Sequence, residues 1–83
     1  MNHTEIKRVA LTVLADIAPE ATTLAIDDTQ SLREQLDLDS MDFLNFVIGL
    51  HRALHVDIPE TDYAKVQTMN ALTAYLAAKL DAA

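Results

Sequence analysis

The chain of 83 residues has no cysteine and no tryptophan, a single glycine and only two prolines. Without cysteine it forms no disulfide, offers no thiolate to a metal ion and has no thiol nucleophile of its own. Because glycine and proline are few and β-branched runs are scarce, the composition favours helices over a sheet. Only two Phe and two Tyr are present, so the core must consist mainly of Leu, Ile, Val, Ala and Met.

Basic residues are also few: six Lys and Arg stand against 13 Asp and Glu, which gives a formal net charge of −7. This charge opposes sequence-independent binding to nucleic acids and anionic lipids, and it favours partners with basic protein surfaces. No apolar run approaches the roughly 18 residues of a membrane-spanning helix, and no signal-peptide pattern opens the sequence. We therefore expect a cytoplasmic protein with no nucleic-acid partner and no stable membrane insertion.

Apolar residues at helical spacing predict a first amphipathic helix over residues 2–18. Asn2, with Glu5 three residues later, resembles a capping box, and Thr4 is an alternative N-cap. Pro19 ends the helix at or near Ala18, because the residue before a proline disfavours helical backbone. The predicted buried stripe consists of Ile6, Val9, Ala10, Val13, Leu14 and Ile17.

Residues 19–39 form a long connection, which would be unusual as a structureless loop in so small a domain. We expect its apolar residues to fix it to the bundle, with a helical turn over residues 31–35. These apolar residues are Leu24, Ile26, Leu32, Leu36 and Leu38.

A second helix is predicted over residues 40–55. Met41, Leu44, Val47, Ile48 and Leu54 are its expected buried face, and Phe43, Phe46 and Leu50 widen its apolar surface. Gly49 in its middle costs about 1 kcal/mol relative to Ala. That cost indicates a close backbone approach or room for something to pass, or else a glycine that is merely tolerated.

The remaining chain predicts an extended turn at residues 56–59 and a short third helix over residues 61–66, with Tyr63 and Val66 facing inward. Thr68 is the expected cap of a last helix, in which Met69, Leu72, Tyr75, Leu76 and Leu80 recur at helical spacing. The predicted fold is all-α: a small four-helix bundle with three main helices, a short third helix and a long loop between helices one and two. We expect residues 1–83 to form one domain.

Ser40 is the candidate functional residue, because an Asp-Ser pair begins the second helix. Its hydroxyl lies at the positive end of the helix dipole, where an attached anion is favoured. An enzyme would need a base beside it, but His51 and His55 lie about 16 and about 22 Å further along the helix axis. His3 is at the end of the chain. The sequence therefore predicts a serine that is not activated within the chain.

Metal binding is not indicated either. His51 and His55 share a helix face, but no third ligand stands at a matching spacing. Asp37 and Asp39 mimic the first two ligand positions of an EF-hand loop, yet the required glycine and final glutamate are missing. We predict no metal site.

Residues 36–42 read Leu-Asp-Leu-Asp-Ser-Met-Asp, which resembles the signature of acyl carrier proteins, an Asp-Ser-Leu or Asp-Ser-Met at the start of the second helix. The resemblance extends from the first helix to Tyr75-Leu76 in the last. It implies that a phosphopantetheinyl transferase attaches the 4′-phosphopantetheine of coenzyme A to Ser40 through a phosphodiester. The thiol of that arm then carries acyl groups as thioesters, so the protein is a carrier and not an enzyme, and we expect it to be a monomer.

The resemblance also implies transient docking of acyl-loading and acyl-transferring enzymes that have basic surfaces. The docking residues it implies are Asp39, Met41, Asp42, Glu60 and Asp62. Typical fatty-acid carriers have further acidic residues where this chain has Asn45 and then His-Arg-Ala at 51–53, and Asp37 replaces their usual Gly. These departures favour a specialised carrier that serves a dedicated acyltransferase or a secondary-metabolite pathway over the general carrier of fatty acid or lipid biosynthesis.

Two other functions remain open. One is an aminoacyl or peptidyl carrier of the nonribosomal-peptide type, which has the modified serine but typically lacks this acidic balance. The other is a helical interaction module that keeps the carrier fold without being modified. The intact Asp39-Ser40-Met41 sequence favours a modified carrier over that module.

Overall fold

The computed structural model describes residues 1–22 and 25–82. Its elements, in chain order, are α1 (His3–Ile17), the 3₁₀ turn η1 (Pro19–Thr22), α2 (Leu32–Leu36), α3 (Ser40–Leu54), the 3₁₀ helix η2 (Glu60–Val66) and α4 (Met69–Ala82). The described part contains no strand, only one isolated antiparallel bridge between Ser31 and Thr68. The all-helical prediction is therefore confirmed, with η2 as the short third helix and α2 as an additional turn inside the long connection.

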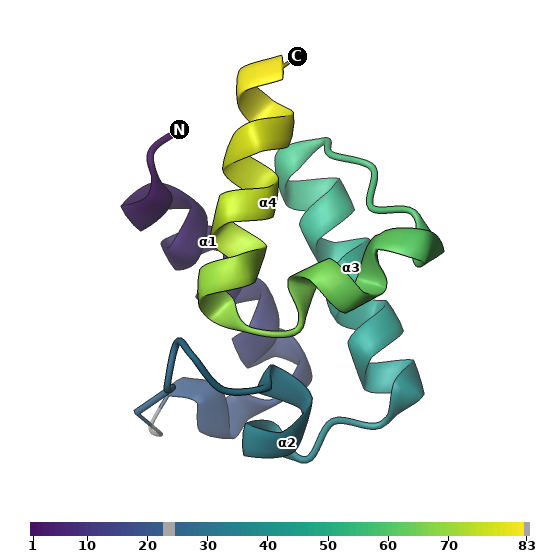
Figure 1. The fold of residues 1–83 in the computed structure, drawn as a ribbon. Coiled ribbons are helices and arrows are strands. Elements are labelled where there is room, and N and C mark those ends of the chain that lie inside the picture. Colours follow the sequence, from purple (N-terminus) through teal and green to yellow (C-terminus); the bar gives the residue numbers. More distant parts are fainter. Residues whose placement is uncertain (23–24, 83) are drawn as a thin grey trace.

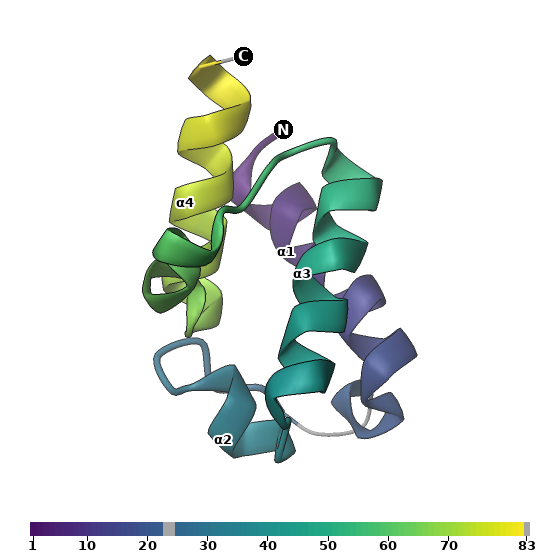
Figure 2. The ribbon, with the colours of Figure 1, turned by 90° about the vertical axis from the view of Figure 1, so that its right-hand side faces the viewer.

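The three long helices α1, α3 and α4 enclose the core, and α2 closes one end of the bundle (Figures 1 and 2). Both chain ends lie at the opposite end, so the start of α3 is beside α2 and far from the termini. No helix in the described ranges has the length and apolar character needed to cross a bilayer.

The predicted capping box of α1 is confirmed. The N–H of Glu5 donates to Oδ1 of Asn2 at 2.8 Å, and the Glu5 carboxylate accepts from the N–H of Asn2 at 3.3 Å. Asn2 is therefore the cap, and Thr4 lies inside the helix. At the other end, the N–H of Ala18 donates to the Leu14 carbonyl at 2.8 Å before the chain turns at Pro19.

The long connection is fixed to the bundle as predicted. Leu32, Leu36 and Leu38 are buried, and Ile26 packs against the core; Leu24 lies outside the described residues. Ser31 caps α2, confirming the helical turn expected over residues 31–35. The connection is also bound to the last helix, because the N–H of Asn70 donates to the Asp28 carbonyl at 3.0 Å.

The predicted buried face of α3 is wrong in part. Val47 and Leu54 are buried, but Met41, Leu44 and Ile48 are exposed by 63%, 37% and 39%. The buried face is instead Phe43, Phe46, Val47, Leu50 and Leu54. Because α3 is apolar on two sides, two stripes compete for the core, and the stripe with both phenylalanine rings removes more apolar area from water.

Of the alternatives left open for Gly49, the structure shows a close approach, to the side chain of Val13. A Cβ atom at this position would overlap with Cγ1 of Val13, so the missing side chain lets α3 lie directly against α1. This contact fixes the helix that carries Ser40 against the rest of the bundle.

The C-terminal elements follow the sequence prediction closely. Val66 of η2 is fully buried and Tyr63 is half-buried. Thr68 caps α4, since its hydroxyl accepts from the N–H of Ala71 at 3.1 Å. Of the predicted inward residues of α4, Met69, Leu72 and Leu76 are buried, while Tyr75 and Leu80 are partly buried against the core.

Candidate functional site

Ser40 is the first residue of α3, and its side chain is exposed. The residue before it, Asp39, is the N-cap, and its Oδ1 accepts from the N–H of Asp42 at 2.8 Å. The Asp42 carboxylate in turn accepts a hydrogen bond from the N–H of Asp39 at 3.3 Å, which completes a capping box. Because Asp39 does the capping, the hydroxyl of Ser40 is not needed to begin the helix.

The turn that leads to Ser40 depends on Asp37. This residue ends α2 in the left-handed region, with φ 53° and ψ 46°. Glycine adopts this conformation most readily, and Asp and Asn tolerate it better than other residues do. Asp37 thus adopts a conformation that glycine favours, without being a glycine. The next residue, Leu38, is buried and anchors the turn in the core.

Arg33 lies beside Ser40, a contact that the sequence analysis did not foresee. Its Nη2 is 3.4 Å from Oγ of Ser40, and its Cζ lies over the ring of Phe43 at 5.6 Å from the centroid. Arg33 belongs to α2 and Ser40 to α3, so no periodicity within one helix relates the two residues. The two residues are seven positions apart, and the turn between them was not predicted from the sequence. No sequence pattern therefore indicated that their side chains meet.

A hollow of about 350 Å³ opens next to Ser40, between α3 and η2. Arg33, Ser40, Phe43, Leu44, Glu60 and Tyr63 line it. A second hollow of about 260 Å³ is lined by Ile48 and His51 further along α3 and again by Tyr63. Tyr63 lines both hollows, and its ring meets Phe43 edge-on, with centroids 5.6 Å apart.

No histidine lies beside Ser40 in the described residues. His51 is in the last turn of α3, where its Nδ1 is 3.1 Å from the Val56 carbonyl. His55 is the C-cap of the same helix, in the left-handed conformation. Among the residues described, no group of three or more His, Cys, Asp or Glu is placed to hold a metal ion. Within the described ranges, the arrangement therefore supplies an accessible hydroxyl with no histidine beside it to act as a general base.

Four of the five residues implied in docking lie around the same end of α3. Asp39 and Met41 are exposed, Asp42 is half-buried by its capping contact, and Glu60 is exposed at the rim of the hollow next to Ser40. With Leu44 and Ile48, Met41 forms an exposed apolar stripe that runs along α3 from Ser40.

Asp62 is bound differently from the other four. Its Oδ2 accepts from the hydroxyl of Tyr75 at 2.6 Å, and its Oδ1 is 3.3 Å from Nζ of Lys65. The Tyr75 hydrogen bond lowers the pKa of Asp62 below its usual value. Burial, together with the same bond, raises the pKa of Tyr75 to about 12. The carboxylate therefore joins η2 to α4 in addition to contributing surface charge.

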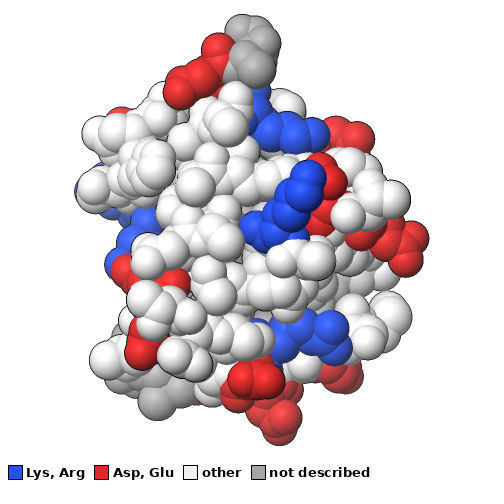
Figure 3. All heavy atoms as spheres, in the orientation of Figure 1, with Lys and Arg blue, Asp and Glu red and all other residues white. Residues whose placement is uncertain are grey.

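Charges of both signs share the face shown in Figure 3. Acidic side chains lie mainly along its margins, and Lys and Arg side chains stand between them. The net charge of −7 is therefore not spread as a continuous acidic surface over this face.

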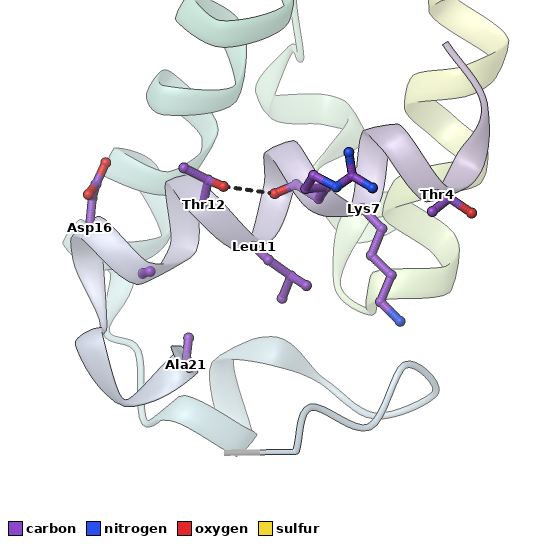
Figure 4. A pocket seen from close by; sticks show the side chains of 8 residues that line it. Thr4, Lys7, Leu11, Thr12, Asp16 and Ala21 are labelled. Carbon is purple, nitrogen blue, oxygen red and sulfur yellow. Dashed lines mark hydrogen bonds between the residues drawn. The ribbon is translucent and has the colours of Figure 1, made fainter. Parts of the chain in front are cut away.

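A larger hollow, of about 650 Å³, lies between α1 and η1 (Figure 4). Leu11 and Ala21 point into it, while the hydroxyl of Thr12 donates to the carbonyl of Arg8 at 3.0 Å. Lys7 at its edge pairs with Asp28 at 2.7 Å. None of the predicted site residues lines this hollow, so it is separate from the Ser40 site.

Comparison with known families gives a match to one sequence model, described as a phosphopantetheine attachment site, over residues 8–76. The matched range extends from the first half of α1 into α4 and includes Ser40, Arg33 and Tyr63.

Proposed function

Because this chain belongs to the carrier-protein family defined by a phosphopantetheine attachment site, we propose that Ser40 is the residue that receives the group. The family attaches 4′-phosphopantetheine covalently to a serine, and this sequence has only Ser31 and Ser40. Ser31 is engaged as the cap of α2, where its Oγ accepts from the N–H of Glu34. The observation that carries the proposal is the exposed Ser40 hydroxyl at the first position of α3, which Asp39 frees from capping.

The surroundings of Ser40 suit a phosphodiester. The first turn of α3 directs N–H groups that lack a helical partner toward its N-terminus, where an anion is favoured. The hollow of about 350 Å³ beside Ser40 gives an attached arm apolar and polar surface to lie against. When attached, the arm supplies a thiol that forms thioesters with acyl groups.

In the proposed modification, Oγ of Ser40 attacks the phosphorus of coenzyme A that bears the pantetheine. A bond between Oγ and phosphorus forms, and the bond from that phosphorus to the adenosine-bearing half of coenzyme A breaks. That half leaves with the electron pair. The serine proton passes to a base of the phosphopantetheinyl transferase, which accounts for a site without a histidine beside Ser40 in the described residues.

Docking of the transferase and of acyl-transferring enzymes is proposed around the start of α3. Asp39, Met41, Asp42, Glu60 and Asp62 are the proposed docking residues, and the exposed Leu44 and Ile48 extend the apolar part of the surface. Such a surface fits a partner that has an apolar patch bordered by basic residues. The side chain of Asp62 is held by Tyr75 and Lys65. Its proposed contribution to docking is therefore a negative charge at a fixed position.

The surface also supports a specialised carrier. Only the first turn of α3 is acidic, its middle is neutral and apolar, and its last turn carries His51 and Arg52. A partner that recognises acidic residues along the whole helix would lose contacts here. If the enzymes of general fatty acid synthesis elongate acyl chains on this protein at their normal rates, the specialised role is wrong.

The modification is tested by the intact mass of the protein after incubation with coenzyme A, magnesium and a broad-specificity transferase. We expect a gain of one phosphopantetheine on the wild type and none on Ser40→Ala. Loading of the product with acyl and with amino-acid donors then separates an acyl carrier from an aminoacyl carrier. An active transferase that leaves the wild type unmodified would contradict the proposal and favour the unmodified interaction module.

A further inference from the structure

We propose that Arg33 binds the phosphodiester formed on Ser40 and thereby directs the attached arm into the hollow between α3 and η2. The inference rests on the proposed modification of Ser40. In this proposal, Arg33 of α2 positions the arm.

The distance between the two side chains is the first observation. Nη2 of Arg33 is 3.4 Å from Oγ of Ser40. In the modified protein, that oxygen is bonded to phosphorus, and the charged phosphate oxygens lie one bond further out, within reach of the same guanidinium. Arginine presents several N–H donors in a planar fork that matches two phosphate oxygens at once, so the pairing is charge-assisted and directional.

The guanidinium is also held in place before any phosphate is present. Its Cζ lies 5.6 Å from the centroid of the Phe43 ring, within the range of a cation–π contact. Phe43 is itself buried and packs against Phe46 and Tyr63, with ring centroids 6.4 and 5.6 Å away. A phosphodiester would therefore meet a preorganised cation and would cost little additional side-chain entropy.

The charge around Ser40 makes such a cation useful. Asp37, Asp39 and Asp42 all lie within three residues of the serine, and they would repel a phosphodiester. Arg33 belongs to neither of the salt bridges found among the described residues, Lys7–Asp28 and Lys65–Asp62. Its charge is thus available to offset the repulsion at the point of attachment.

The position of Arg33 gives the arm a direction. Arg33 and Ser40 line the same hollow as Glu60 and Tyr63 of η2. A phosphodiester drawn toward Arg33 places the first atoms of the arm in this hollow, along Phe43 and Leu44, and not over the outer side of α3. The arm would then run toward Tyr63.

The test uses the modified forms of the wild type, Arg33→Gln, Arg33→Lys and Arg8→Gln. Arg8 is the matched control, because it is an exposed arginine on α1 beside the separate hollow. Intact mass first establishes that each protein carries one phosphopantetheine. A wild type that stays unmodified would contradict the proposed function itself, whereas the role of Arg33 is judged by comparing the modified variants with the modified wild type. Thermal unfolding of the unmodified proteins establishes that each variant folds.

Two readouts then report on Arg33 alone. The ³¹P chemical shift of the phosphodiester should change in Arg33→Gln, change less in Arg33→Lys and stay at the wild-type value in Arg8→Gln. A paramagnetic label on the arm thiol should broaden the amide signals of Glu60 and Tyr63 in the wild type, and this enhancement should fall at least twofold in Arg33→Gln. An unchanged ³¹P shift together with an unchanged relaxation profile in folded, modified Arg33→Gln would overturn the inference.

Discussion

Gly49 of α3 lies so close to Val13 of α1 that a Cβ atom on the glycine would overlap with Cγ1 of the valine. Since α3 carries Ser40 at its first position, this contact helps to set the orientation of the end of the helix at which we propose modification.

Gly49→Ala should therefore destabilise the protein, although alanine is the better helix former. The gain in helix propensity is about 1 kcal/mol, whereas forcing a methyl group against Cγ1 of Val13 costs about 1–3 kcal/mol. We expect a net loss of stability in chemical denaturation, with α1 and α3 pushed apart.

The double variant Val13→Ala with Gly49→Ala is the control for that result. Removing the valine methyl groups makes room for the new Cβ, so the two substitutions should be less destabilising together than the sum of their separate effects. Additive effects, or a stabilising Gly49→Ala, would show that the contact does not limit the approach of the helices.

The hydrogen bond between Tyr75 and Asp62 predicts a pH-dependent stability. The pKa of Asp62 is lowered from 3.8, mainly by this bond, so its stabilisation is present above pH 3.8 and is lost as the pH falls through the lowered value. The pKa of Tyr75 is raised from 10.0 to about 12, so its contribution is present below pH 10 and is lost as the pH rises toward about 12.

Tyr75→Phe should therefore lower the Tm at neutral pH, and the difference from the wild type should shrink at both extremes of pH. Tyr63→Phe is the control, because it leaves the bond between Asp62 and Tyr75 intact. A difference between wild type and Tyr75→Phe that stays constant from acid to alkaline pH would contradict the assignment.

The left-handed conformation of Asp37 predicts that Asp37→Gly is stabilising. A residue with a Cβ is destabilised by about 1–2 kcal/mol in the left-handed region, whereas glycine loses roughly 0.5–1 kcal/mol more than other residues in backbone entropy on folding. We expect a gain of about 0.5–1 kcal/mol in the free energy of unfolding. His55→Gly should behave in the same direction, since His55 has φ 54°. A loss of stability in both variants would contradict the prediction.

Asp39 combines a structural role with a proposed docking role, and two substitutions separate them. Asp39→Ala removes the cap of α3 and should cost about 1 kcal/mol of stability. Asp39→Asn keeps a side-chain oxygen that can accept from the N–H of Asp42, so its stability should stay near the wild-type value. If the charge of Asp39 contributes to docking, the rate of modification by the transferase should nevertheless fall in Asp39→Asn. An unchanged rate would remove Asp39 from the docking surface.

The exposed apolar stripe on α3 gives a second test of docking. Ile48→Gln should leave the free energy of unfolding within about 0.5 kcal/mol of the wild type, because the side chain is 39% exposed. Transfer of an acyl group by a partner enzyme should become slower. Val47→Gln is the contrasting variant, since Val47 is buried and its substitution should destabilise the core.

Much of this fold could be predicted from the sequence, because its signals are local. The capping box at Asn2, the end of the first helix at Pro19 and the cap at Thr68 each depend on residues within one helical turn. For Gly49 the sequence left a close contact, room for something to pass and a tolerated glycine open, and the structure shows the close contact.

The errors and omissions concern relations between elements. The sequence did not decide which of two apolar stripes of α3 faces the core, because both have helical spacing; tertiary packing placed the rings of Phe43 and Phe46 inside. The contact of Arg33 with Ser40 arises across the turn at Asp37, and the left-handed conformation of that turn had not been predicted.

The most direct test of the central claim is localisation of phosphopantetheine by fragmentation mass spectrometry after transferase treatment. Ser31 and Ser40 are the only serines in the sequence, so Ser31→Ala is a matched control for Ser40→Ala. The account predicts that the group is found on the peptide containing Ser40, that Ser31→Ala is modified as fully as the wild type, and that Ser40→Ala is not modified. Phosphopantetheine on Ser31, or its attachment to Ser40→Ala, would contradict the account.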